Sequence, residues 1–244
     1  MSIHEQYADI IAGAETVQRM LDGMPRAVDF LPAASETKFA AANCNERWAL
    51  RSSKRFLDLV IAIPALMVLA PFLIVLSLLI RLDSAGPSLF RQTRLGHQGR
   101  PFSIFKFRTM TVLENGARIE QARPDDARTT RIGRWLRAFS LDELPQLINV
   151  VKGEMSLVGP RPHALAHDAL YARLIPHYGL RQTIKPGITG WAQIHGLRGA
   201  TPTVEIMSRR VDYDACYAAH ASLALDLKIL LRTPLEIIRR RNAY

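Results

Sequence analysis

The sequence predicts a membrane-associated α/β protein with one re-entrant membrane helix, amphipathic interfacial helices and a small cytoplasmic domain containing a short sheet or hairpin. Three observations support this class. Residues 59–80 carry no charged side chain, and Pro64 and Pro71 interrupt that apolar run. The residues after it alternate apolar and basic side chains between glycine-rich turns. The predicted boundaries separate an N-terminal extension (1–46), a basic flank with the membrane helix (47–83) and the cytoplasmic domain (84–244).

Composition limits the range of partners. The 244 residues contain 32 Lys and Arg against 22 Asp and Glu, a net charge of +10. This balance excludes an acidic disordered chain and indicates an anionic partner, which leaves nucleic acid, an anionic membrane face and a phosphorylated substrate open. The two cysteines, Cys44 and Cys216, form neither a disulfide framework nor a zinc-binding spacing.

The N-terminal extension has no basic segment followed by an apolar one, so we expect no signal peptide there. Residues 7–21 have the pattern of a short amphipathic helix followed by a linker. A mobile tail is nevertheless the favoured interpretation of residues 1–46.

The apolar run is long enough for a membrane helix. Its 22 residues reach about 33 Å at ~1.5 Å per residue, and a bilayer core is ~30 Å thick. Basic residues flank it on both sides, among them Arg51 and Arg55 before it and Arg81 and Arg91 after it. Because such residues prefer the cytoplasmic side, the flanks favour a helix that bends and returns to the same face. Pro71, near the middle, is the expected break, and a spanning helix is the alternative.

The cytoplasmic domain begins with a predicted β-hairpin over residues 88–110 and a polar loop over 112–130. Residues 130–159 predict one or two amphipathic helices, in which Ile132, Trp135, Leu136 and Phe139 share a face. Such a face suits the headgroup layer of a membrane or an ordinary core. The segment from residue 222 to the end is also amphipathic and carries a basic cluster.

Two adjacent acids, Asp142 and Glu143, are the first candidates for chemistry. A capping box, with Ser140 as N-cap and Glu143 three residues later, is the structural interpretation. Pro145 weakens it, because a helix capped at Ser140 would require the amide that proline lacks. The functional interpretation is that the pair binds Mg²⁺ or presents a carboxylate nucleophile.

Several basic residues are candidates for an anion site. In Gly-Pro-Arg-Pro (159–162), two prolines constrain the backbone around Arg161, whose planar guanidinium suits phosphate oxygens. Four further cations are candidate contributors, although a solvated charge is the favoured interpretation of each one taken singly: Arg91, Arg94, Lys106 and Arg108.

A turn-rich loop at 185–193 is the second binding candidate. It could hold a nucleobase or sugar, or form a tight corner with its tryptophan in the core. Its candidate residues are Lys185, Pro186, Gly187, Trp191 and Gln193. His163 and His167 have helical metal-ligand spacing but lack a third ligand, which argues against zinc. Phosphate-loop, dinucleotide-binding and nucleic-acid-binding motifs are absent, so we expect no nucleic-acid partner.

Five segments together resemble one family. They are Lys54-Arg55-x-x-Asp58, FKFRTM (105–110), SLDELPQ (140–146), GEMSLVGPRP (153–162) and KPGITGWAQ (185–193). In this order they are similar to the bacterial sugar transferases, monotopic polyprenyl-phosphate phosphoglycosyl transferases. The likeness covers about residues 51–244. Residues 159–168 and 198–214 and the terminal Asn-Ala-Tyr are most similar to undecaprenyl-phosphate glucose phosphotransferases of exopolysaccharide synthesis.

The resemblance implies a fold and a location. It implies a re-entrant helix broken at Pro71 with both ends cytoplasmic, at the bacterial inner membrane. Some relatives have serine before this proline, whereas this chain has Ala70. The break must therefore depend on Pro71 and its neighbouring packing rather than on a serine hydroxyl.

The resemblance also implies a reaction. Asp142 attacks the sugar-side phosphate of a UDP-sugar, releases UMP and passes the phosphosugar to undecaprenyl phosphate. Mg²⁺ and Arg161 would offset the charge repulsion, with Asp142 and Glu143 as candidate metal ligands. Glucose is the expected sugar. Galactose or an N-acetylhexosamine donor and a non-catalytic basic membrane scaffold are the alternatives. A homodimer stays open.

Overall fold

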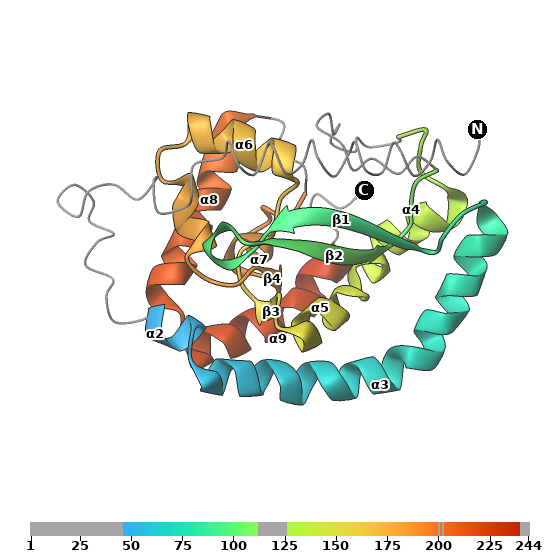
Figure 1. Ribbon diagram of the computed structural model, residues 1–244, viewed down its shortest axis with the longest axis horizontal. Coiled ribbons are helices and arrows are strands. Elements are labelled where there is room, and N and C mark those ends of the chain that lie inside the picture. The colour runs from blue at the N-terminus through green and yellow to red at the C-terminus, as the bar shows by residue number, and fades with distance from the viewer. Residues whose placement is uncertain (1–45, 112–125, 200, 202, 240–244) are drawn as a thin grey trace.

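The computed structural model describes residues 46–111, 126–199, 201 and 203–239. The helix expected at 7–21, almost all of the N-terminal extension and most of the loop expected at 112–130 lie outside the described residues. The described residues form mainly helices, with two small two-stranded sheets (Figure 1). This agrees with the predicted combination of one long apolar helix, shorter helices and a hairpin.

One long helix forms an edge of the molecule. After the short helix α2 (Glu46–Ala49), helix α3 (Ser52–Asp83) extends over 32 residues with Pro64 and Pro71 inside it. Figure 1 shows α3 running along the base of the molecule and then bending upward. Each proline removes a backbone donor and crowds the preceding turn, which favours such a bend. The structure therefore has one continuous bent helix where the sequence predicted a break at Pro71.

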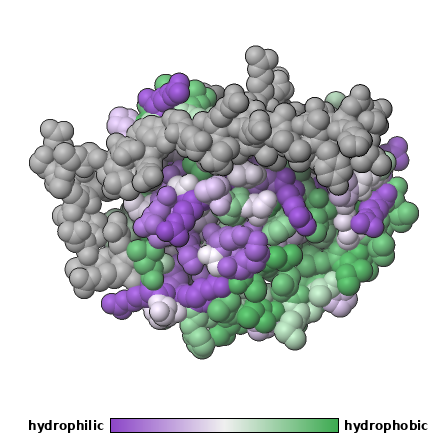
Figure 2. Space-filling model, viewed as in Figure 1, coloured by the Kyte–Doolittle hydropathy of each residue, from purple (hydrophilic) through white to green (hydrophobic). Residues whose placement is uncertain are grey.

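The surface of α3 is apolar. Its most apolar segment has only 11% of its residues buried, and the exposed fractions of Met67 and Val68 are 72% and 78%. Figure 2 shows hydrophobic surface along α3, whereas polar residues gather over the hairpin. Within the described ranges α3 alone is long and apolar enough to cross a membrane. Its exposure is typical of a lipid-facing helix and untypical of a soluble core helix.

The predicted hairpin is present. Strands β1 (Leu89–Leu95) and β2 (Pro101–Phe107) pair antiparallel, with Leu89 opposite Phe107 and Leu95 opposite Pro101. A short 3₁₀ helix, η2 (His97–Gly99), forms the turn. Phe102 and Ile104, two residues apart on β2, are both buried in the core, as the two-residue period of a strand requires, and Phe107 is buried in a separate cluster against α3 and Leu136.

The acid pair lies between two helices. Helix α4 (Arg131–Ala138) is followed by a 3₁₀ turn, η3 (Leu141–Glu143), and by helix α5 (Gln146–Lys152). The predicted capping box at Ser140 and Glu143 does not form. Ser140 has the left-handed φ of 59° and its side chain caps nothing, whereas Thr130 caps α4 by accepting from the amide of Gly133 at 2.9 Å. Glu143 is thus free to bond elsewhere.

A small parallel sheet joins two of the quoted segments. Strands β3 (Ser156–Val158) and β4 (Gly187–Thr189) place Ser156 opposite Gly187. The backbones approach so closely that a Cβ on Gly187 would lie 2.1 Å from the amide nitrogen of Gly159. The turn 159–162 and the loop 185–193 therefore pack together through glycine.

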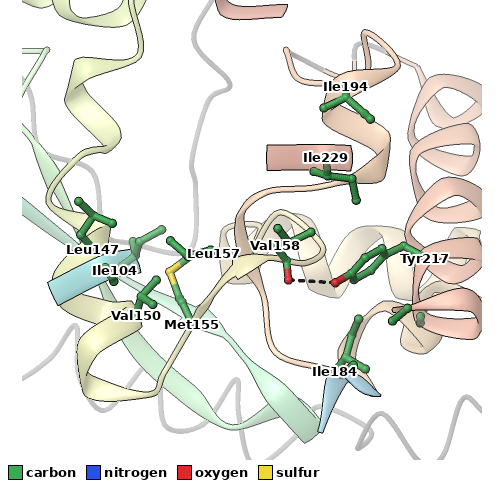
Figure 3. Packing of buried hydrophobic residues seen from close by; sticks show 14 of the residues in the cluster. Ile104, Leu147, Val150, Met155, Leu157, Val158, Ile184, Ile194, Tyr217 and Ile229 are labelled. Atoms are coloured by element: carbon green, nitrogen blue, oxygen red, sulfur yellow. Dashed lines mark hydrogen bonds between the residues drawn. The ribbon is translucent and has the colours of Figure 1, made fainter. Parts of the chain in front are cut away.

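Five further helical elements follow in the described chain. They are α6 (Leu165–Leu174), η4 (Tyr178–Gln182), α7 (Trp191–Ile194), α8 (Val204–His220) and α9 (Leu223–Arg239). Figure 3 shows the core between these elements, where Val150, Val158 and Ile229 are buried. The hydroxyl of Tyr217 donates to the carbonyl oxygen of Val158 at 3.3 Å.

The Lys54-Arg55-x-x-Asp58 motif fastens α3 to this core. Lys54 Nζ lies 2.7 Å from Asp226 Oδ2 on α9, and Arg55 donates to two main-chain carbonyls of α5. Asp58 accepts from the amide of Leu157 on β3 at 3.0 Å. The motif thus sets the position of the apolar helix relative to the domain that carries the acid pair.

Candidate active site

The acid pair is held in a 3₁₀ turn whose two carboxylates have opposite environments. Glu143 is buried, with an exposed fraction of 6%, whereas Asp142 is partly exposed. Successive residues in a turn point in different directions, so two adjacent acids can face different surroundings.

Three cations converge on Glu143. Lys106 Nζ on β2 lies 2.8 Å from its Oε1, and the guanidinium of Arg161 reaches both carboxylate oxygens, with one contact at 3.0 Å. Arg198 approaches Oε2 at 3.5 Å. Burial alone would raise the pKa of Glu143, but the charges of Arg161 and Lys106 outweigh it and hold the pKa well below its usual range. Glu143 is therefore an ionised anchor for three cations.

The carboxylate of Asp142 makes no hydrogen bond or ion pair with any residue in the described part of the chain. Burial, and next the negative charge of Glu143, raise the pKa of Asp142 to about 6. The charges of Lys106, Arg137 and Arg161 act in the opposite direction. At neutral pH Asp142 is therefore an ionised carboxylate whose oxygens are free to react, beside a surplus of positive charge.

The turn that carries Arg161 is braced on all sides. Arg181 donates to the carbonyl oxygen of Arg161, and Arg94 donates to that of Pro162 at 2.9 Å. The amide of Gly187 donates to the carbonyl oxygen of Pro160 at 2.9 Å. The two prolines and these bonds fix the main chain around Arg161, while its guanidinium contacts Glu143; that it binds a phosphate stays a prediction.

A buried polar network supports Arg181. Its guanidinium contacts Asp214 at 3.0 Å, and Tyr178 donates to Asp168 at 2.6 Å. His163 joins the network through Tyr178 at 2.7 Å, and burial and then the charge of Arg181 lower its pKa well below the usual range. His163 is therefore a neutral member of a buried network of arginines and has a structural position.

Not every cation of the hairpin reaches the acid pair. Arg91 lies over the ring of Phe105 at 5.2 Å on an exposed face, and Arg94 supports the turn 159–162 as described. Arg108 is buried and bonds to the last carbonyls of α3, including that of Ile80 at 3.3 Å. It therefore caps the long helix and lies apart from the acid pair.

The loop 185–193 also divides into two parts. Lys185, Pro186 and Gly187 pack against the turn 159–162, and burial followed by the charge of Arg55 lowers the pKa of Lys185. Trp191 packs edge-on against His195, with their ring centroids 4.3 Å apart.

Gln193 is buried and lines a cavity that reaches Glu143. Its Nε2 donates to the carbonyl oxygen of Ile188 at 3.0 Å.

Comparison with known proteins shows the family of this chain. The model of the family described as "Bacterial sugar transferase" matches residues 49–240, most of the chain. The chain belongs to the bacterial sugar transferase family. The match contains the acid pair, all three cations around Glu143 and the Lys54-Arg55-x-x-Asp58 motif, and so confirms the family inferred from the quoted segments.

The chain is similar to several named members of this family. The chain is 52% identical over 198 residues to a UDP-glucose:undecaprenyl-phosphate glucose-1-phosphate transferase of Caulobacter vibrioides, covering 81% of this chain and 74% of that protein. A protein of the same name from Escherichia coli is 48% identical over 194 residues, covering 80% of this chain but 42% of its own length. The exopolysaccharide production protein PSS of Rhizobium leguminosarum is 43% identical over 195 residues, covering 78% of this chain and 98% of that protein.

The sequence motifs did not indicate Arg198, the third cation at Glu143. It lies 55 residues from Glu143 in sequence. Its only sequence signal was its place at the start of 198–214, a segment that indicated the subfamily but no particular role.

Of the two acids, Asp142 is the one with carboxylate oxygens available to hold Mg²⁺. The described residues contain no group of three or more acidic, histidine or cysteine side chains placed to hold a metal. Mg²⁺ commonly binds one or two carboxylates and completes its shell with water and substrate phosphates. Asp142 has free oxygens for that purpose, whereas the oxygens of Glu143 already face three cations. The site therefore suits an ion that arrives with a phosphorylated substrate.

Proposed function

We propose that this chain transfers glucose-1-phosphate from UDP-glucose to undecaprenyl phosphate and releases UMP, as the first membrane step of exopolysaccharide assembly. The names of the Caulobacter and Escherichia relatives support the substrates, and the name of the Rhizobium relative supports the role. The observation that carries the proposal is the free carboxylate of Asp142 beside three cations that Glu143 gathers.

In the first step an oxygen of Asp142 forms a bond to the sugar-side phosphorus of UDP-glucose. The bond from that phosphorus to the bridging oxygen breaks, and UMP leaves with the bridging oxygen. An anionic nucleophile approaching a pyrophosphate meets strong repulsion, which Lys106, Arg161 and Arg198 offset. Their partial exposure, 17–22% of each side chain, lets them turn from Glu143 toward phosphate oxygens. Mg²⁺ at Asp142 would neutralise further pyrophosphate charge when bound.

In the second step a phosphate oxygen of the polyprenyl phosphate attacks the same phosphorus. The bond to Asp142 breaks, which regenerates the carboxylate and yields the lipid diphosphate sugar. Two successive displacements at one nucleophile predict ping-pong kinetics and exchange of UMP into UDP-glucose without lipid.

The proposed location is the cytoplasmic face of the bacterial inner membrane, with α3 re-entrant. The bend of α3, its exposed apolar surface and the basic residues beyond both ends support this arrangement. The lipid phosphate lies at headgroup depth, so an acid pair close to the interface can meet it. Accessibility of single cysteines at residues 51 and 84 from the same side of a vesicle tests the topology. Opposite sides would overturn it.

The deciding experiment measures UMP release from UDP-glucose with Mg²⁺ and undecaprenyl phosphate in nanodiscs. Asp142→Asn should reduce release by at least ~10³-fold, as loss of a covalent nucleophile does. It should not lower the thermal unfolding midpoint, because the carboxylate of Asp142 has no hydrogen bond within the described ranges and its raised pKa shows that folding already disfavours its charge. Release that persists in Asp142→Asn overturns the assigned nucleophile.

A panel of UDP-sugars in the same assay tests the donor. Release only with UDP-galactose or a UDP-N-acetylhexosamine keeps the chemistry and overturns glucose. No release from folded wild type with any donor would indicate a membrane scaffold.

A further inference from the structure

A cavity of about 240 Å³ lies beside the acid pair, between α5, the parallel sheet and α9. Its wall is predominantly apolar, and six of its residues are Leu144, Leu147, Leu157, Ile188, Leu230 and Ile237. A dry apolar cavity of ~150 Å³ holds a benzene molecule, so this one has room for on the order of ten carbon atoms. It is therefore large enough for two five-carbon units of an isoprenoid chain.

Charged residues line two parts of the cavity. Ser140, Glu143 and Arg198 lie together beside the acid pair, where Glu143 also holds Lys106 and Arg161. On α9, Glu236 also lines the cavity and pairs with Arg239 at 2.8 Å. A ligand that fills the whole space would carry an anionic group at one end and a hydrocarbon next to it. This is the chemistry of a lipid phosphate.

The polar groups of the wall mostly bond to one another. The hydroxyls of Thr189 and Thr233 lie 2.7 Å apart, and Thr233 donates to the carbonyl oxygen of Ile229. Gln193 Oε1 has no hydrogen bond in the described part of the chain, but it lies against Gly190, where an added Cβ would come within 3.3 Å of it. Oε1 of Glu236 accepts from Arg239 at 2.8 Å, and its Oε2 has no hydrogen bond within the described ranges.

Helix α9 connects the cavity to an exposed apolar surface. Leu230 and Ile237 line the cavity, whereas their chain neighbours Leu231 and Ile238 are each 76% exposed. Leu235, between them, is 54% exposed. Helix α9 thus presents apolar side chains both in the cavity and on the exposed surface next to it, which offers a route for a hydrocarbon chain.

We infer that this cavity receives the first isoprene units of the polyprenyl phosphate and so places its phosphate at Asp142; the inference rests on the proposed function. The hydrocarbon gains little free energy by the transfer, since the bilayer is equally apolar. The benefit is in the reaction rate. Binding of the first isoprene units fixes the attacking phosphate against the phosphosugar, and a misplacement of 1 Å can cost ~10²-fold in rate.

Two pairs of matched variants test the inference. Leu230→Trp and Ile237→Trp fill the cavity from α9, whereas Leu231→Trp and Ile238→Trp make the same change at adjacent exposed positions. The first readout is exchange of labelled UMP into UDP-glucose without lipid. The second is full transfer to undecaprenyl phosphate in nanodiscs.

The cavity-filling variants should exchange UMP at the wild-type rate and lose transfer efficiency toward the lipid by roughly tenfold or more. Both exposed-face variants should match the wild type in both assays, because tryptophan keeps that exposed surface apolar and leaves the cavity open. Exchange that falls as strongly as transfer would show that the cavity holds the nucleotide or the sugar, and transfer that stays unchanged would show that it holds no substrate. Either result overturns the inference. Absence of exchange in the wild type would instead overturn the proposed function.

Discussion

Two buried ionic clusters in this protein contain the same kinds of residue and differ in how their charges are matched. The anchor cluster, at the base of α3, contains Lys54, Asp58 and Asp226, one cation against two carboxylates. The acid-pair cluster contains Asp142 and Glu143 against three cations, Lys106, Arg161 and Arg198.

Every carboxylate of the anchor cluster has partners. Asp226 is fully buried and accepts from Lys54, Trp48 and Tyr217, at 2.7, 2.9 and 2.5 Å. Asp58 accepts from Ser156 and the amide of Leu157. The acid-pair cluster instead leaves one carboxylate without a bond and has a surplus of cations. Saturated bonding fits a structural role, whereas a free carboxylate in a positive field fits binding and reaction with an anion.

The largest expected effect comes from replacing one lysine in each cluster. Lys54→Met removes the one cation bonded to Asp226, and breaking such a buried pair costs about 3–5 kcal/mol. Lys106→Met leaves Glu143 with Arg161 and Arg198, so we expect a stability loss of about 1 kcal/mol but a loss of ~10² in transfer rate. Thermal unfolding in detergent and UMP release measure the two effects.

The two lysine variants are controls for each other, because the substitution is identical. Equal losses of stability would contradict the difference between the clusters. So would a Lys106→Met protein that transfers at the wild-type rate.

A second prediction concerns pH. The first step requires an ionised Asp142, whose pKa is raised to about 6 by burial and then by Glu143, so UMP exchange should fall as the pH drops below about 6. Glu143→Gln removes the negative neighbour, and the pKa of Asp142 then falls. The acidic limb of the profile should move to lower pH, while the maximum rate drops because the three cations lose their anchor. Exchange rates from about pH 5 to 8 test this, and an acidic limb that moves to higher pH contradicts it.

The sequence predicts much of this fold because its strongest signals are local. A charge-free run of 22 residues specifies α3, and alternating side chains between glycine turns specify the hairpin. The adjacent acids were recognisable as a pair for the same reason. The two prolines predict a bend in α3, but their positions do not determine whether the helix breaks or continues through it.

The environment of the acid pair depends on residues distant in sequence. The partners of Glu143 lie 37, 18 and 55 residues away, on three separate segments. Lys106 and Arg108 are equivalent by charge and spacing, yet one reaches Glu143 and the other caps α3 beyond the end of β2. Sequence pattern does not separate them, because the direction taken by the chain after Phe107 decides which anion or carbonyl each side chain meets.

The smallest expected effect comes from an aspartate-to-asparagine substitution in the anchor cluster. The same change at Asp142 should abolish transfer. Asp58→Asn keeps an amide oxygen that can accept from Ser156 and Leu157, and burial already raises the pKa of Asp58 and so disfavours its charge. We expect a stability loss of about 1 kcal/mol and transfer within about twofold of the wild type. Thermal unfolding and UMP release in nanodiscs measure both. A folded Asp58→Asn protein as inactive as Asp142→Asn would mean that saturated bonding does not distinguish a structural carboxylate from a reactive one in this protein.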